Sequence, residues 1–205
     1  MLCDIGNTFL HFFDGEKIIK EPLKNIHRYK DEEVFYISVN RGLESVLKDF
    51  KKWHNLERFV RVDGEYEGMG VDRRALCMAV DEGVIVDAGS AVTVDLMQNG
   101  IYGGGFIYPG LWRMRECYAG ISPVLDVDFV EFSPTKLPKD TRSAVSYGAI
   151  VPLVTAINSL GKSVYLTGGD ADILHRYLPR AQRDDRLIFK GMKKAKEEYD
   201  NSSFA

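Results

Sequence analysis

The chain has 205 residues, and its 27 Lys and Arg against 30 Asp and Glu give a formal net charge of −3. A composition that is 45% hydrophobic and 28% charged is typical of a globular protein rather than a disordered one. The near-neutral charge, without a basic run, argues against a nucleic-acid surface, and no apolar stretch approaches the roughly 18 residues that cross a bilayer. We therefore expect a soluble protein that binds neither nucleic acid nor membranes.

The beginning of the chain is predicted to be part of the fold rather than a signal peptide for export. Residues 1–7 contain no basic segment followed by an apolar one, the pattern of a signal peptide. The three cysteines, Cys3, Cys77 and Cys117, form no C-x-x-C pair, and their odd number argues against a disulfide framework. Both observations predict a cytoplasmic protein.

The first 82 residues predict strands, followed by strands and helices in alternation. β-prone apolar runs predict strands, and apolar residues at helical spacing predict helices. The expected strands are 1–5, 9–13, 34–39 and 59–62, and the expected helices are 43–56 and 74–80. An Asp14-Gly15 pair predicts a hairpin turn after the second strand.

From Gly83 onward the opening pattern of the chain begins again. The expected strands are 84–90, 92–96, 103–108, 163–167 and 186–189, and the expected helices are 111–118, 141–160, 172–177 and 192–199. Asn99-Gly100 predicts a hairpin between the second strand and Ile101-Tyr102. The segment that starts at Asp4 returns 83 residues later at Asp87. This repeat predicts two lobes, residues 1–82 and 83–205.

Three expected strand ends lead into turns of small residues. They are Gly6-Asn7-Thr8, Gly89-Ser90-Ala91 and Thr167-Gly168-Gly169. Glycine lets backbone N–H groups approach a phosphate closely. The acids Asp4 and Asp87 before the first two turns would repel a bare phosphate but would hold a cation that bridges to it. Any one turn could be an ordinary tight turn, but the set of three favours a phosphate site.

Three further features each admit two interpretations. Asp72 and Arg73 could form a surface ion pair, or could serve a phosphoryl-transfer site as proton acceptor and anion contact. The glycine-rich stretch 103–110 could be a β-bulge that serves packing, or a strand that another group approaches. Thr141, preceded by Asp140, could cap the following helix or contact a substrate.

Taken together, the motifs resemble those of the type III pantothenate kinases, in order and over nearly the whole chain. They are Asp4-x-Gly6-Asn7-Thr8, Gly70-x-Asp72-Arg73, Asp87-Ala88-Gly89-Ser90-Ala91-x-Thr93, Gly104-Gly105-x-Ile107-x-Pro109-Gly110, Thr141-x-x-Ala144-x-x-x-Gly148 and Thr167-Gly168-Gly169-x-Ala171. That family belongs to the sugar kinase, Hsp70 and actin superfamily. The resemblance implies an α/β fold of two ribonuclease-H-like lobes, with mixed sheets flanked by helices.

The resemblance also implies roles for individual residues. The nucleotide phosphate loop would consist of Asp4, Ile5, Gly6, Asn7, Thr8, Phe9, Leu10 and His11. The pantothenate segment would consist of Gly70, Val71, Asp72 and Arg73, with Asp72 as general base and Arg73 as an anion contact. Asp87 would hold an activating monovalent cation, K⁺ or NH₄⁺; Ser90 would contact ATP, and Thr141 the substrate. Mg²⁺ would accompany ATP, and the protein would be a homodimer.

The chain departs from the family in three respects. Position 90 is Ser where Thr is usual, although the hydroxyl is kept. A tyrosine normally lies seven residues before Gly70, but that position is Asp63, and the nearest tyrosine is Tyr66. Whether Tyr66 contacts pantothenate stays open. The chain is also short for the family, which predicts trimmed loops.

The function implied is ATP-dependent phosphorylation of pantothenate to 4′-phosphopantothenate, the first step of coenzyme A biosynthesis. One alternative on the same fold is a phosphatase or polyphosphate hydrolase, in which water replaces the hydroxyl acceptor. A second is a regulatory or DNA-associated accessory factor, against which the acidic net charge argues. A third is a catalytically inactive binding module, against which the retained acids argue.

Overall fold

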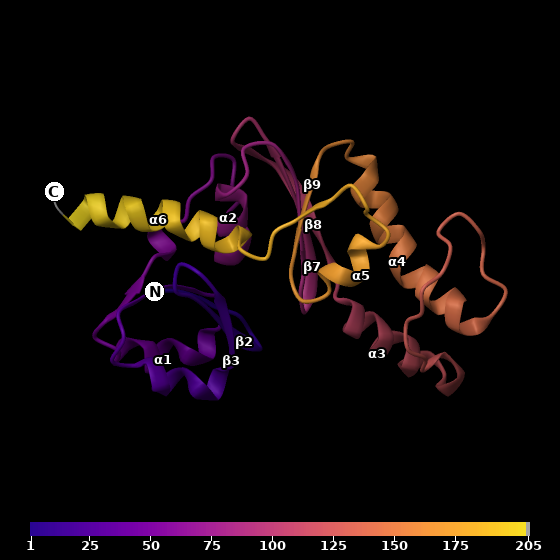
Figure 1. The fold of residues 1–205 in the computed structure, drawn as a ribbon, viewed down its shortest axis with the longest axis horizontal. Coiled ribbons are helices and arrows are strands. Elements are labelled where there is room, and N and C mark those ends of the chain that lie inside the picture. The colour runs from indigo at the N-terminus through magenta and orange to yellow at the C-terminus, as the bar shows by residue number, and fades with distance from the viewer. Residues whose placement is uncertain (204–205) are drawn as a thin grey trace. The chain divides into compact units, whose positions relative to one another are not determined.

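The computed structural model describes residues 1–203, which form two compact units (Figure 1). The first unit contains residues 1–81, 99–102 and the chain from Arg186 onward, and the second contains residues 82–98 and 103–185. This grouping differs from the expected lobes 1–82 and 83–205, because two later segments pack with the first unit. The lobes 1–82 and 83–205 themselves stay a prediction.

Each unit is associated with a five-stranded mixed sheet, and the two sheets have the same strand order. The first consists of β1 (Leu2–Ile5), β2 (Phe9–Phe13), β3 (Ile18–Pro22), β4 (Val34–Ser38) and β5 (Trp53–Asn55), in the order β3-β2-β1-β4-β5. The second consists of β6 (Gly83–Ala88), β7 (Ala91–Gln98), β8 (Ile101–Pro109), β9 (Val164–Thr167) and β10 (Gln182–Arg183), in the order β10-β9-β6-β7-β8. In each, the first strand pairs antiparallel with the second and parallel with the fourth. The expected α/β fold with mixed sheets is confirmed.

The first sheet is covered on both faces. On one face, Leu2, Phe35 and Ile37 pack against the helices α2 (Val71–Met78) and α6 (Leu187–Ser203). On the other face, Cys3, Ile5, Phe12 and Tyr36 pack against the 3₁₀ helix η1 (Leu23–Tyr29) and the region of α1 (Glu44–Lys48). Alternation of buried side chains along β1 therefore builds two cores, as a strand between two layers requires.

The second sheet packs one face against helices. Val84, Val86 and Ala88 of β6 share a core with α4 (Thr141–Ser159) and α5 (Ala171–His175). The remaining elements are α3 (Leu111–Ile121) and the 3₁₀ helices η2 (Arg41–Leu43), η3 (Glu57–Phe59) and η4 (Pro123–Leu125). The expected Asn99-Gly100 hairpin is present between β7 and β8, with both residues at positive φ, 53° and 78°.

Three expected elements are wrong, and in each case tertiary contacts prevail over the local pattern. The helix expected at 43–56 ends at Lys48, because the chain turns and pairs residues 53–55 with β4, which still buries Leu47, Phe50 and Trp53. The strand expected at 59–62 is a 3₁₀ turn and a loop. The strand expected at 186–189 belongs to α6, because Phe189, Met192 and Ala195 are all buried at helical spacing.

The helices α2 and α6 lie side by side (Figure 1), with almost no space between their backbones at one point. A Cβ atom on Gly191 of α6 would overlap the carbonyl oxygen of Ala75 in α2. Glycine is therefore required at position 191 by close approach of another backbone rather than by its φ angle.

We predict that Gly191→Ala lowers the free energy of unfolding by about 1–3 kcal/mol or more, because overpacking must force the helices apart. Gly120→Ala is the matched control, since its Cβ would meet nothing within 4 Å on α3 and alanine favours a helix. Chemical denaturation of the two variants would show opposite changes. A Gly191→Ala protein as stable as wild type would contradict this packing.

Candidate functional site

In the first unit, the hairpin between β1 and β2 presents an exposed turn beside an acid. Asn7 and Thr8 are exposed, and the Gly6 N–H donates to the Phe9 carbonyl at 3.0 Å. Asp4 pairs across the strands with His11, whose Nδ1 lies 3.5 Å from Asp4 Oδ2. The expected phosphate loop, Asp4 to His11, thus consists of the ends of β1 and β2 and the turn at residues 6–8, of which Asn7 and Thr8 are exposed.

Asp72 lies in the first turn of α2, which begins three residues before the helix expected at 74–80. Its Oδ1 accepts a hydrogen bond from the Arg73 backbone N–H at 2.8 Å. Burial raises the pKa of Asp72, the Arg73 N–H opposes this rise, and the negative charge of Asp4 adds to it. The raised pKa suits the Asp72 carboxylate to accepting a proton.

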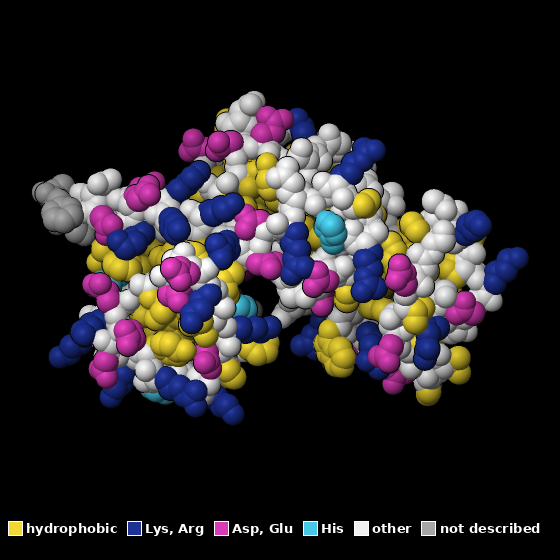
Figure 2. Space-filling view, in the orientation of Figure 1, with side chains coloured by type: hydrophobic (Ala, Val, Ile, Leu, Met, Phe, Trp, Pro, Cys, Tyr) yellow, Lys and Arg dark blue, Asp and Glu magenta, His cyan; other side chains and the backbone are white. Residues whose placement is uncertain are grey.

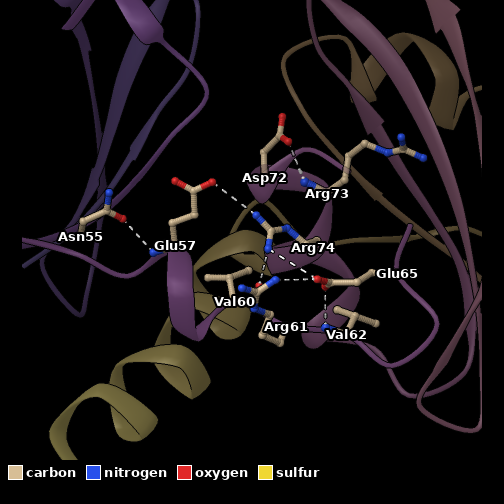
Figure 3. A network of polar contacts seen from close by, with 9 residues as sticks. All are labelled: Asn55, Glu57, Val60, Arg61, Val62, Glu65, Asp72, Arg73 and Arg74. Carbon is tan, nitrogen blue, oxygen red and sulfur yellow. Dashed lines mark hydrogen bonds and ion pairs between the residues drawn. The ribbon is translucent and has the colours of Figure 1, made fainter. Parts of the chain in front are cut away.

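Arg73 is buried rather than exposed, so the interpretation as a surface ion pair is wrong. Its side chain is 5% exposed. Its guanidinium donates to the hydroxyl of Tyr66 at 2.6 Å and to the hydroxyl of Tyr102 at 3.1 Å. Figure 3 shows the Arg73 side chain extending away from the carboxylate of Asp72, whose dashed line ends on the Arg73 backbone nitrogen.

Arg74, the next residue, fastens the preceding loop to α2 (Figure 3). Its Nη1 donates to the Val60 carbonyl at 2.9 Å, and its guanidinium pairs with Glu57 at 3.4 Å and Glu65 at 3.7 Å. Glu65 in turn accepts from the Val62 N–H at 2.9 Å. These side-chain contacts explain why 59–62 does not form a strand.

In the second unit, three oxygen-bearing side chains share one face of the sheet near the end of β6. Asp87 is the antiparallel partner of Thr93 and the parallel partner of Thr167. Gly168, at φ 97°, packs so closely that a Cβ there would lie 2.5 Å from Asp87 Oδ1. Among the residues that the structure describes, the buried Thr93 Oγ1 has no hydrogen-bond partner. An orphaned oxygen beside a carboxylate fits a site for a hard cation.

Ser90 and Thr141 also lie in the second unit. Ser90 is exposed in the two-residue turn between β6 and β7. Thr141 is exposed in the first turn of α4, and the cap is Asp140, whose Oδ1 accepts from the Ser143 N–H at 2.9 Å. The interpretation of Thr141 as the helix cap is therefore wrong, and its substrate contact stays a prediction.

The structure thus groups Asp4 to His11 with Gly70 to Arg73 in the first unit, and groups Asp87, Ser90 and Thr141 in the second. Sequence reasoning missed Tyr102, which is 29 residues from Arg73 and carries no local signal of that contact. It also missed the role of Arg74, which it placed only at the start of an expected helix. Thr93 was within a motif but was assigned no role.

Two sheets of one strand order, each with an acid on its first strand and a turn directly after it, define a duplicated ribonuclease-H-like α/β fold. The sequence model of the type III pantothenate kinases matches residues 54–163. A type III pantothenate kinase of Sulfurimonas denitrificans is 44% identical over 94% of this chain and 95% of its own. One of Campylobacter jejuni is 40% identical over 98% of each chain. The chain belongs to the type III pantothenate kinase family.

A solved structure supports the same backbone. A Campylobacter jejuni protein named as a Baf family transcriptional activator matches with a TM-score of 0.90 at 40% identity, over 98% of each chain. Within residues 1–203, no helix is both long enough and apolar enough to cross a membrane.

The raised pKa of Asp72 predicts a pH-dependent stability. Because burial disfavours the charged carboxylate, the folded protein binds the proton more tightly than the unfolded chain, so Asp72 costs stability once pH rises through its folded pKa. We expect Asp72→Asn to melt above wild type at neutral pH, where each kcal/mol shifts the midpoint by about 2–4 °C. The gain should shrink on acidification toward the ordinary pKa of aspartate.

Thermal melts across pH, with the exposed Asp31→Asn as control, test this expectation. A gain that does not depend on pH, or a loss of stability at neutral pH, would contradict it.

Proposed function

We propose that this protein transfers the γ-phosphoryl group of ATP to the primary hydroxyl of pantothenate, which gives 4′-phosphopantothenate for coenzyme A synthesis. The observation that carries the proposal is the arrangement at the start of α2. There, the half-buried Asp72 carboxylate, whose pKa is raised, lies next to the buried Arg73, in a chain that belongs to the type III pantothenate kinase family.

Asp72 is the proposed general base. Phosphoryl transfer needs positioning and charge stabilisation more than covalent help, so the protein's main proton step is removal of the hydroxyl proton of the acceptor. A carboxylate with a raised pKa is a stronger proton acceptor than an ordinary aspartate. Arg73 is the proposed contact to the carboxylate of pantothenate, since a guanidinium suits bidentate binding of that group.

The proposed nucleotide contacts begin with the loop from Asp4 to His11. The exposed turn at Asn7 and Thr8 supports this role, because backbone N–H groups can approach a phosphate there. Mg²⁺ bound with ATP would neutralise phosphate charge, and Asp4 is the acid within that loop. Ser90 and Thr141 keep the ATP and substrate contacts that the resemblance assigns to them.

Asp87 is the proposed ligand of a monovalent cation, K⁺ or NH₄⁺. The unpartnered Thr93 hydroxyl and the adjacent Thr167 support this assignment, because neutral oxygens with a single carboxylate suit a singly charged ion. Among the described residues, no group of three His, Cys, Asp or Glu side chains could hold a metal ion. The proposed site therefore combines the Asp87 carboxylate with the hydroxyl oxygens of Thr93 and Thr167.

We also propose a cytoplasmic homodimer. Four large apolar side chains of the second unit, in β8, in α3 and just beyond it, are exposed: Ile107, Trp112, Ile121 and Val124. Apolar side chains gathered in neighbouring elements favour a protein interface. The cytoplasm is the compartment that supplies ATP.

Hydrolysis and gene regulation are the competing functions. The name of the Campylobacter jejuni structure keeps regulation open for that protein. On the face of the molecule that Figure 2 shows, basic and acidic side chains are interspersed, and with the net charge of −3 this disfavours DNA binding there.

A coupled assay of ADP formation, with and without pantothenate, in potassium and then sodium buffer, tests the function. Pantothenate-dependent ADP formation that potassium stimulates supports the kinase. Phosphate release that is equally fast without pantothenate would support a hydrolase. Salt-sensitive duplex binding without kinase activity would support a regulator.

We predict that Asp72→Asn lowers kcat by about 10²- to 10⁴-fold while substrate binding is largely retained, because only the proton acceptor is lost. Steady-state kinetics with Asp31→Asn as the matched exposed control measure the effect. An Asp72→Asn enzyme with near-normal kcat would remove Asp72 from the role of base.

We predict that Asp87→Asn raises the potassium concentration for half-maximal activity by about tenfold or more, since the only carboxylate of the proposed site is lost. Thr93→Val should raise it less and should not destabilise the protein, because the hydroxyl has no partner within the described chain. Potassium titrations of activity measure both changes. Unchanged titration curves would exclude a cation at this position.

A further inference from the structure

Arg73 is held by two tyrosines that come from different parts of the first unit. Tyr66 lies in the loop before α2, and Tyr102 lies in β8. Tyr66 is 48% exposed and Tyr102 only 8% exposed, so the pair has an outer and an inner member. Their ring centroids are 6.2 Å apart.

The inner tyrosine has a fixed backbone. The Tyr102 N–H donates to the Asp63 carbonyl at 2.8 Å, and Asp63 and Ile101 form an isolated parallel bridge. Gly64, at φ 82°, packs so closely that a Cβ would lie 2.9 Å from the Tyr102 carbonyl oxygen. Asp63 occupies the position where the family usually carries a tyrosine, and here its backbone holds a tyrosine from another strand.

The chemistry of these contacts favours orientation of the guanidinium. An arginine side chain has several rotatable bonds, and immobilising it on binding an anion costs conformational entropy. The two hydroxyls bind different terminal nitrogens, Nη1 and Nη2, and therefore set both the position and the plane of the group. As neutral acceptors, they do this without themselves cancelling its charge.

We propose that Tyr102 is a positioning residue that holds Arg73 ready for the carboxylate of the acceptor substrate, with Tyr66 as the outer partner. The inference rests on the proposed function, because it takes pantothenate as that acceptor. Tyr102 acts through Arg73 and not on the reacting hydroxyl. Its removal should therefore weaken selection of the anionic substrate rather than slow the chemical step.

The test compares pantothenate with pantothenol, its neutral analogue in which an alcohol replaces the carboxylate. Tyr102→Phe should raise the KM for pantothenate by about 10- to 100-fold, the scale of one hydrogen bond to a charged group, with kcat within about twofold. The efficiency with pantothenol should change by less than about twofold, so that the preference for pantothenate falls. Tyr66→Phe, at an exposed position, should shift the preference in the same direction by a smaller factor.

Tyr108→Phe is the matched control, because Tyr108 lies in the same strand and its hydroxyl donates to the Ala149 carbonyl at 3.1 Å instead. It should leave the preference unchanged. Equal losses on both substrates for Tyr102→Phe, or no loss on either, would overturn the inference while wild-type activity upholds the proposed function. A wild-type protein inactive on pantothenate would overturn the proposed function and this inference with it. If Tyr102→Phe does not fold, a Tyr66→Phe enzyme with an unchanged preference for pantothenate over pantothenol would overturn the inference that the two tyrosines orient Arg73.

Discussion

The approach of α6 to α2 is the contact on which the first unit depends. At Gly191 the two helices touch backbone to backbone, and this lets both lie on the same face of the first sheet. The helix α2 is thereby fixed between the sheet and α6, and its first turn carries Asp72 and Arg73. Desolvation is the main cause of the raised pKa of Asp72, so the packing that holds α2 on the sheet contributes to the basicity of this carboxylate.

The two units carry the same hairpin design with different side chains around it. In the first, three residues join β1 to β2, and Asp4 faces His11 across the strands. In the second, a two-residue turn joins β6 to β7, and Asp87 faces Thr93. A histidine beside the acid and a longer turn suit anionic phosphates, whereas hydroxyl oxygens suit a cation. The same strand order thus brings a histidine next to the acid in one hairpin and a hydroxyl next to the acid in the other.

Much of this could be predicted from the sequence, because the informative signals are local. The repeated hairpins, the Asn99-Gly100 turn and the α/β class depend on residues close together in the chain. The errors arose where distant contacts decide. The apolar spacing of 43–56 fits a helix as well as it fits a turn and an edge strand, and only pairing with β4 selects the second. Tyr102 meets Arg73 only through the tertiary fold, so no motif could reveal it.

The position of α6 has a consequence for how the protein is made. A ribosome completes the second unit before it reaches residue 186, yet the first sheet needs α6 to cover Phe13, Phe35 and Ile37. The first unit therefore waits, with an apolar face open, while the middle of the chain is synthesised, and such nascent surfaces bind chaperones or aggregate.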